Sequence, residues 1–458
     1  MSEAVGHPFS GRPRPRRARG PLRRYAIIEF LTWLPTGLYL APMVLLMAAR
    51  GLGVGEIGLV SAAYAVTIVV LELPTGGLAD VLSRRAVLAA SAVVGVLGLA
   101  LMATAGTVWM FFLSSALKGV SRALSSGPAQ AWYVDALHAE EGVSADLKPG
   151  LAAGDVAGSV ALAVGTLAGG ALPLLPLVSR LSAADALAVP VWAATGTAVV
   201  QLAAVLVLMR DPSASAGGAP TTAGGGVRRG GRFGEVLRGV PLTIVDGIKL
   251  GLTDRGLGRL LLIAAGAGVT LNTIELLTPG RLADLTGSPQ TGSTAYAVVT
   301  AVGFVANALG SSLAPAVARR VGGSVRAAIL GCVVVSVAVG ALAASVALPG
   351  WAGIAAAAGA YIVLFAALAV VSLFRSELVH RRVSSAQRAT VMSVDSLQLQ
   401  FGGALSSFVL VPLAGVVGLG PVWAVTAVVG LAFTLLFVRL PSPRAERVAD
   451  PVAVIAVK

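Results

Sequence analysis

Twelve apolar runs of about 20 residues follow one another along the chain, separated by charges, glycine or proline. A helix of about 20 apolar residues is long enough to cross the hydrocarbon core of a bilayer. We therefore predict an all-α membrane protein of twelve transmembrane helices. The predicted spans are residues 25–48, 55–75, 86–105, 107–128, 151–173, 190–209, 258–280, 293–316, 325–347, 352–374, 390–414 and 421–440.

The longest gap between these runs, residues 211–257, divides them into six and six. We predict two six-helix bundles, at 25–210 and 258–440, joined by this cytoplasmic linker. An arginine-rich cytoplasmic tail at 1–24 and a second tail at 441–458 complete the chain. Apolar residues recur at helical spacing late in the linker, which predicts a helix lying in the membrane interface. These residues are Val236, Val240, Ile244, Ile248 and Leu252.

The composition also indicates a membrane environment. The chain is 56% hydrophobic and 12% charged, whereas a soluble protein carries about 25% charged residues. The net charge of +13 would indicate a nucleic-acid partner only if the basic residues formed one face of a polar domain. They lie instead between the apolar runs, so we predict no nucleic-acid partner.

The basic residues fall almost entirely on one side of the predicted spans. With the N-terminus inside, the outer loops receive only Arg50, Arg180 and Arg281. Because lysine and arginine accumulate in cytoplasmic loops, we predict that both termini are cytoplasmic. The basic residues on that side are Arg12 to Arg24, Arg84, Arg85, Lys148, Arg228 to Arg259, Arg319, Arg320, Arg326, Arg375, Arg381, Arg382, Arg388 and the C-terminal arginines.

Several classes of function lack the residues that they need. Residues 1–20 are polar and carry no secretory signal, so the first apolar run is expected to remain as a span. No Walker A sequence is present, which argues against ATP-driven transport by this chain alone. The three histidines are scattered and Cys332 is the single cysteine. We therefore predict no metal site, no cofactor and no intramolecular disulfide.

A polar segment at residues 72–85 follows the second apolar run and reads Glu-Leu-Pro-Thr-Gly-Gly-Leu-Ala-Asp-Val-Leu-Ser-Arg-Arg. A carboxylate such as Asp80 beside Arg84 and Arg85 can form a charge-assisted network that holds helices in one arrangement. Gly76 permits close approach of helices. The simpler interpretation, a positive anchor at the membrane surface, explains the arginines but not Asp80.

This segment resembles the cytoplasmic loop motif of the major facilitator superfamily, Gly-x-Leu-Ala-Asp-Arg-x-Gly-Arg-Lys, from which Val81 and Ser83 depart. The twelve spans, their equal division and the long middle linker are also similar to that family. The Glu-Leu-Pro-Thr-Gly segment and residues 387–390 resemble bacterial drug-efflux members. Drug-efflux members usually carry a glycine-rich motif with a Gly-Pro pair in span five. This pair is missing here, which weakens the indication of export. The matching loop positions are Gly76, Leu78, Ala79, Asp80, Arg84 and, conservatively, Arg85.

The resemblance implies a gate at the cytoplasmic ends of the helices. Asp80 and Arg84 would latch the two halves in the outward-facing state. Asp135 would complete a relay with Arg84; the alternative is a solvated loop acid. Asp395 is expected to pack at the same gate. The candidate gate residues are Glu72, Gly76, Asp80, Arg84, Arg85, Asp135 and Asp395.

The resemblance also implies a central cavity lined by spans one, four, seven and ten. Ionisable side chains inside spans are costly, so they are candidates for function. Glu29, Trp33 and Thr36 share one face of span one, and Lys118 and Arg122 lie one turn apart on span four. We predict that Glu29 pairs with Arg122 and exchanges a proton for this cation, which would couple transport to a proton gradient. The alternative is a static pair that holds the helices together.

Span seven carries a second polar group, Asn272 and Glu275, one turn apart. We expect Glu275 near the outer end of the cavity, as a candidate for substrate or proton binding. The alternative is a solvated helix end.

These features predict a secondary transporter and not an enzyme. Proton-coupled export of a hydrophobic or amphipathic small molecule by alternating access is the preferred function, as in antiporters of multidrug resistance. The alternatives are an uptake permease for a small organic solute and a non-transporting membrane sensor or scaffold with the same fold. The expected partners are a small-molecule substrate, protons and the lipid bilayer. The chain is expected to be a monomer in the bacterial cytoplasmic membrane.

Overall fold

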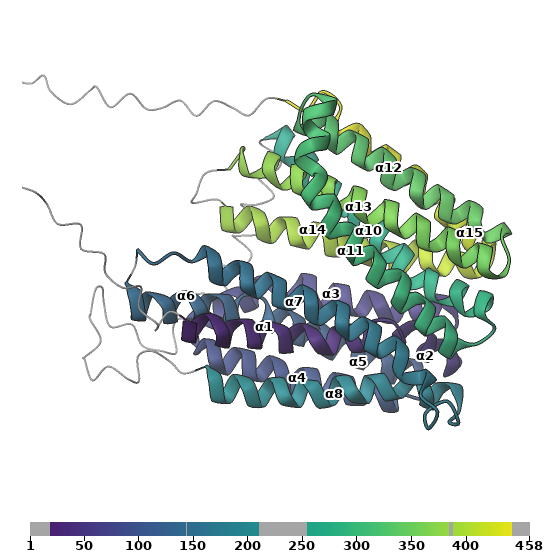
Figure 1. Cartoon of the computed structure of the whole chain (residues 1–458), viewed down its shortest axis with the longest axis horizontal. Helices are drawn as coiled ribbons and strands as arrows, with labels where there is room; N and C mark the ends of the chain where they lie inside the picture. The colour runs from purple at the N-terminus through teal and green to yellow at the C-terminus, as the bar shows by residue number, and fades with distance from the viewer. Residues whose placement is uncertain (1–18, 143, 210–253, 384–387, 442–458) are drawn as a thin grey trace, which may run out of the picture.

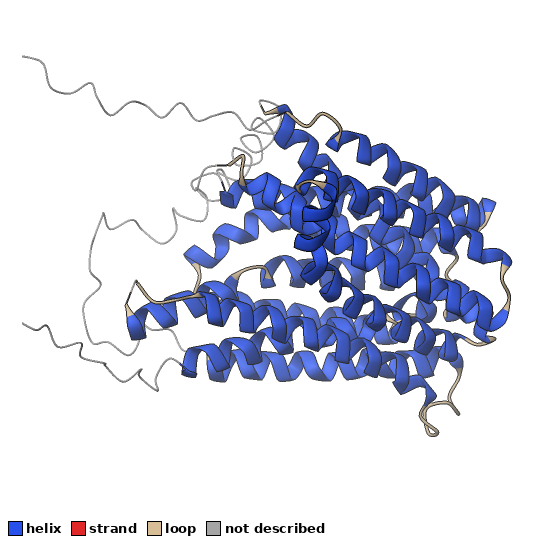
Figure 2. Ribbon diagram, turned by 45° about the horizontal axis from the view of Figure 1, so that its top comes forward, coloured by secondary structure: helices blue, strands red, loops and turns tan. Residues whose placement is uncertain are grey.

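Every regular element that the computed structural model describes is a helix, and the loops between them are short (Figure 2). This confirms the predicted all-α class. The interfacial helix predicted from Val236 to Leu252 and most of both tails lie outside the described residues. For residues 73–81 and 388–390 the structure gives the backbone alone. The described ranges are 19–142, 144–209, 254–383 and 388–441.

The N-half, residues 19–209, contains six long helices and two shorter ones, α2 and α6. The helices of the N-half are α1 (Arg19–Leu40), α2 (Met43–Ala49), α3 (Val54–Val81), α4 (Arg84–Thr104), α5 (Val108–Ser125), α6 (Pro128–Glu141), α7 (Lys148–Ala171) and α8 (Ala183–Leu208). A short 3₁₀ turn, Leu172–Leu174, follows α7.

The C-half, residues 254–441, contains six long helices. They are α10 (Arg255–Thr286), α11 (Pro289–Val321), α12 (Ser324–Ala344), α13 (Gly350–His380), α14 (Arg388–Val417) and α15 (Leu419–Thr434). Two 3₁₀ turns, Ser345–Ala347 and Leu435–Phe437, follow α12 and α15.

Side-chain caps explain where several helices begin. Ser83 Oγ accepts a hydrogen bond from the backbone N–H of Ala86 at the start of α4. At the start of α10, Asp254 Oδ1 accepts from the N–H groups of Gly256 and Leu257. These caps satisfy donors that the first turn of a helix leaves free, so each helix starts at a defined residue.

The first predicted span, 25–48, is two helices in the structure. Pro42 separates α1 from α2, because proline has no N–H to continue the helical ladder. The α1 helix begins at Arg19, before the predicted start of the first span at residue 25.

The fourth predicted span, 107–128, is the most polar of the twelve. Eleven helices of the described residues are long and apolar enough to cross a membrane. The fourth span corresponds to α5 and is not among them, since Lys118 and Arg122 lower its hydropathy. It ends at Ser125, before Gly127, whose φ of 95° belongs to the left-handed region.

The helices run between two ends of the molecule (Figure 1). We call the end at which α1 begins and the described chain finishes, at Pro441, the terminal end. The other end is called the opposite end. In Figure 1 the purple-to-teal N-half lies below the green-to-yellow C-half, and α11 reaches across to α7.

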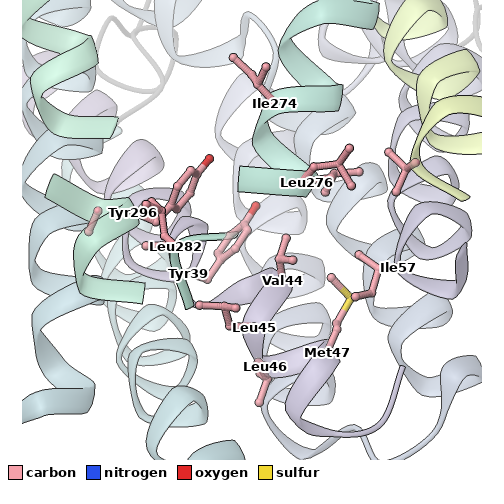
Figure 3. Packing of buried hydrophobic residues seen from close by; sticks show 14 of the residues in the cluster. Tyr39, Val44, Leu45, Leu46, Met47, Ile57, Ile274, Leu276, Leu282 and Tyr296 are labelled. Atoms are coloured by element: carbon pink, nitrogen blue, oxygen red, sulfur yellow. The ribbon is translucent and has the colours of Figure 1, made fainter. Parts of the chain in front are cut away.

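At the opposite end the two halves share one apolar core. Its buried residues include Leu38 and Tyr39 of α1, Leu276 of α10 and Tyr296 of α11. Figure 3 shows side chains from both halves packed together in this cluster. Most contacts between the halves come from the helix pairs α3–α14 and α7–α11.

At the terminal end each half has a separate core. The N-half core contains Tyr25, Tyr133 and Leu137, and the C-half core contains Phe374 and Phe437. Among the described residues, neither of these two clusters includes a residue from the other half. Among the described residues, one apolar core therefore joins the halves at the opposite end, whereas the apolar cores at the terminal end are separate.

Candidate functional site

A cavity of about 240 Å³ lies between the two halves, and we call it the central cavity. Its wall comes from α1, α2, α3 and α5 of the N-half and from α10 and α14 of the C-half. Four of the predicted candidates line it, namely Thr36, Lys118, Asn272 and Glu275. The structure therefore brings one cation and one carboxylate, from different halves, to the same cavity.

Lys118 is a buried amine on α5, with 7% of its surface exposed. Its Nζ lies 4.4 Å from the centroid of the Tyr39 ring. Nζ also lies 3.6 Å from the sulfur of Met43 and 3.5 Å from that of Met102. An aromatic face attracts a cation, whereas thioether sulfur is only a weak hydrogen-bond acceptor. Lys118 has no carboxylate in ion-pair contact among the described residues.

Asn272 and Glu275 lie inside α10, which is tied to α14 by hydrogen bonds. Asn272 Nδ2 donates to Ser407 Oγ at 2.9 Å, and the hydroxyl oxygens of Thr273 and Ser406 lie 2.7 Å apart. Glu275 lies inside α10, eleven residues before its last residue, Thr286, and it lines the cavity.

The charges of Glu275 and Lys118 interact across the central cavity, although the two groups are not in ion-pair contact in the described structure. Glu275 also accepts no hydrogen bond from a described residue. Neither charged group thus has a direct partner of opposite charge among the described residues.

A second cavity of about 260 Å³ lies within the N-half, and we call it the N-half cavity. Residues of α1 and of α3 to α8 form its wall. Thr36, Tyr39, Tyr64 and Lys118 line both cavities, so the two adjoin.

Glu29, Trp33 and Arg122 all line the N-half cavity. The ion pair predicted between Glu29 and Arg122 is absent from the ion pairs of the described residues. Instead, the guanidinium carbon of Arg122 lies 5.0 Å from the centroid of the Trp33 ring. Among aromatic rings, tryptophan attracts a cation most strongly. The Trp33 ring can therefore take the place of the Glu29 carboxylate as the partner of Arg122. The charges of Glu29 and Arg122 still interact at a distance.

Two polar residues of the N-half cavity were missed by the sequence reasoning. Asp155 of α7 lines the cavity and interacts electrostatically with Glu29. Gln201 of α8 is buried and donates from Nε2 to the hydroxyl of Thr32 at 3.1 Å. The sequence could have indicated Asp155 as a candidate, because it is an acidic residue inside the apolar run 151–173.

At the terminal end, Arg84 and Asp135 meet. Arg84 Nε lies 2.9 Å from Asp135 Oδ2, which joins α4 to α6. Arg85 donates from Nη2 to the carbonyl oxygen of Leu206 on α8 at 2.6 Å. For the other two motif candidates, Gly76 and Asp80, the structure describes the backbone alone. The gating roles of all these residues remain predictions.

The remaining two gate candidates make different kinds of contact. Ser396 Oγ on α14 donates to the carboxylate of Glu72 on α3, at 2.9 Å to Oε1, and so joins the two halves. Asp395 instead forms a bidentate ion pair with Arg375 of α13, inside the C-half. Both partners of this pair are largely buried, with 13% and 14% of the side chain exposed.

The arrangement places a lysine of one half and a carboxylate of the other half on the wall of one cavity. Within the part of the chain that the structure describes, no group of three or more histidine, cysteine or acidic side chains is placed to hold a metal ion.

The sequence model of one protein family, described as Major Facilitator Superfamily, matches residues 25–407 of the chain. A search of curated protein sequences gave no match.

Solved structures resemble the whole fold. The crystal structure of the nucleoside transporter NupG has a TM-score of 0.73 at 15% identity, covering 92% of this chain and 98% of that one. A POT family transporter in complex with a thioalcohol-conjugated peptide has a TM-score of 0.66 at 12% identity, covering 93% and 96%. A bacterial homologue of the human lysosomal transporter Spinster, inward-facing and unoccupied, has a TM-score of 0.69 at 15% identity, covering 93% and 98%.

Proposed function

Because the chain belongs to the Major Facilitator Superfamily and is thus a multi-pass membrane transporter rather than an enzyme, we propose that it exports a small hydrophobic or amphipathic molecule in exchange for protons. The observation that carries this proposal is the contrast between the shared core at the opposite end and the separate cores at the terminal end. A cavity lies between the halves, so a rocking movement would expose it to one side and then to the other.

The positive-inside rule supports a cytoplasmic terminal end. Arg84, Arg319 and Arg381 are among the many basic residues at that end, whereas Arg50 and Arg281 lie at the opposite end. In the described state the halves then share an apolar core toward the outside and have separate apolar cores toward the cytoplasm, in the bacterial cytoplasmic membrane.

The N-half cavity supports proton coupling. Glu29 and Asp155 are carboxylates facing one cavity, and Arg122 is held on Trp33 beside them. A carboxylate that has no cation in contact favours its protonated form, and a cation that moves against it favours release of the proton. Movement of Arg122 between Trp33 and Glu29 would then link protonation to the arrangement of α1 and α5.

The gate residues complete the proposed cycle. Glu72, Arg84 and Asp135 lie at the terminal end, where the halves must meet when the cavity opens outward. Asp80, which follows Glu72 on α3, is proposed to join Arg84 in that state.

A direct test uses the purified full-length chain. A thermal-shift screen of amphipathic compounds finds a hit, which is then offered to proteoliposomes whose lumen is more acidic than the medium. Export by exchange predicts that the hit accumulates in the acidic lumen and that the luminal pH rises. Glu29→Gln is expected to abolish both, and Asp155→Asn to weaken them. Glu141→Gln, at an exposed position at the end of α6, is the matched control and should transport normally.

Each outcome of this test is decisive. Accumulation of the hit only in a lumen more alkaline than the medium would establish uptake instead of export. Absence of flux under every gradient would favour a sensor or scaffold. Full proton-driven flux in Glu29→Gln would remove Glu29 from the coupling mechanism.

A further inference from the structure

The wall of the central cavity carries two opposite charges that do not touch. Lys118 comes from α5 of the N-half and Glu275 from α10 of the C-half. Their charges interact, but no nitrogen-to-oxygen distance between them reaches ion-pair contact in the described structure. The space between them is therefore bounded by a cation on one side and a carboxylate on the other.

On the Lys118 side of the cavity, no described anion is in contact with the amine. A lysine ammonium has three N–H donors, and the groups around Nζ are the Tyr39 ring and the sulfurs of Met43 and Met102. None of these carries a formal negative charge. With 7% of Lys118 exposed, water supplies little compensation. An anionic group entering the cavity would supply the missing charge.

On the Glu275 side, no cation of the part of the chain that the structure describes is in contact with the carboxylate. The neighbouring amide of Asn272 already donates to Ser407, and Glu275 forms no hydrogen bond or ion pair with a described residue. A carboxylate in a cavity within the membrane is costly unless it is protonated or paired. A ligand ammonium group would pair with it as an ordinary salt bridge.

The rest of the wall is largely apolar and the space is small. Leu40, Met47, Leu271, Leu276 and Leu399 line it. Its volume of about 240 Å³ lies below the range of about 300–1,000 Å³ that is typical for drug-sized ligands. An apolar body smaller than a typical drug therefore fits between the two charges.

We propose that the central cavity binds a small zwitterion with an apolar body, of the size of an aromatic amino acid, with its carboxylate on Lys118 and its ammonium on Glu275. This inference rests on the proposed function, since it names the substrate class of the same cavity. A bound zwitterion would bridge the two halves and would favour the arrangement in which both charges reach it.

Three probes with the same phenyl ring separate the two charges. Phenylalanine carries both, phenethylamine only the ammonium, and 3-phenylpropanoate only the carboxylate. We expect titration calorimetry on the purified full-length chain to show phenylalanine binding at least about tenfold more tightly than either analogue, because each lost group leaves a charged wall unpaired.

Two variants assign each charge to its residue. Lys118→Met should remove the preference for phenylalanine over phenethylamine and keep its preference over 3-phenylpropanoate. Glu275→Gln should do the reverse. Lys148→Met, at the exposed start of α7, is the matched control and should keep both preferences. Thermal unfolding of each variant checks that it is folded, and Glu275→Gln, which preserves shape, gives an answer even if Lys118→Met does not fold.

The inference is overturned if either analogue binds as tightly as phenylalanine, if none of the three binds, or if the preferences survive in both variants. The last result would mean that Lys118 and Glu275 only close on each other as a gate. These outcomes concern binding without a gradient. The proposed function is tested separately by proton-driven flux of a screened compound, so the two failures are distinguishable.

Discussion

The two ends of the molecule hold the same pair of helix bundles by different means. At the opposite end the contacts between the halves are mainly apolar and very close: a Cβ added to Gly170 of α7 would clash with the Cβ of Ala297 on α11. Thr294 also donates to the carbonyl oxygen of Gly170 at 2.5 Å. At the terminal end the apolar cores are separate, and Ser396 with Glu72 provides a polar contact between the halves.

The ion pairs, unlike the apolar contacts, do not join the two halves among the described residues. Every ion pair found among the described residues joins two parts of the same half: Arg50 with Asp185, Arg84 with Asp135, Arg375 with Asp395, Arg381 with Glu377, and Arg382 with Asp254. Charged pairs thus act within each half, while close packing such as that of Gly170 against Ala297 joins the halves at the opposite end. In lipid such packing has only a modest net driving force, so a contact of this kind can be exchanged for another.

The largest effect is expected where a buried pair is broken inside one half. Asp395→Asn leaves Arg375 without a charged partner, which should lower the stability of the protein by about 3–5 kcal/mol, as seen in a lower midpoint of thermal unfolding in detergent. The double variant Arg375→Leu/Asp395→Leu removes both charges and should recover much of the loss. If Asp395→Asn changed the separation of the halves and not the stability, the pair would belong to the gate instead.

A smaller effect is expected where the halves meet at the opposite end. Gly170→Ala forces the added methyl group against Ala297 and should disfavour the closed contact by about 1–3 kcal/mol. Spin labels at Gly106 and Ala352, both exposed at the opposite end, should then show a second, longer distance. Gly196→Ala is the matched control, because no atom lies near its added Cβ. An unchanged distance in Gly170→Ala would show that this contact does not keep the end closed.

The polar contact at the terminal end should have a still smaller effect. Ser396→Ala removes a hydrogen bond to Glu72 worth about 1 kcal/mol. Labels at Glu141 and Arg320, both exposed at the terminal end, should report a broader or longer distance, with the opposite end unchanged. Ser312→Ala serves as control, since Ser312 bonds only within its own helix. A shorter distance in Ser396→Ala would contradict this assignment.

The smallest effect on stability is expected for the exposed pair at the motif. Asp135→Asn should cost about 0.2–1 kcal/mol, and less at high salt, because Asp135 is 47% exposed. If the predicted gate role is correct, transport should fall much more than stability. Equal losses in Asp135→Asn and in a variant at the exposed Asp146 would remove Asp135 from the gate.

The sequence predicted the helices well because a membrane span leaves a long apolar signature. It also indicated the residues of the central cavity, since Lys118 and Glu275 stand out inside apolar runs. Helix ends were less predictable, because Pro42 and Gly127 separate helices at points that hydropathy alone does not reveal.

Pairings between side chains were the hardest to predict. Helical spacing placed Glu29 and Arg122 at a common depth, but it could not show that the Trp33 face lies closer to the guanidinium. The contribution of Asp155 depends on how α7 packs against α1, which involves glycines such as Gly158 beneath Trp33. Which side chains pair is determined by tertiary packing between segments that are distant in the sequence.

We infer that one coupled movement opens one end of the molecule as it closes the other. It is tested most directly by measuring both label pairs, Gly106 with Ala352 and Glu141 with Arg320, in the Cys332→Ser chain in lipid nanodiscs, with and without Gly170→Ala. We predict that the fraction of molecules with a long distance at the opposite end equals the fraction with a short distance at the terminal end. Unequal fractions, or an opposite end that opens while the terminal end stays apart, would contradict it.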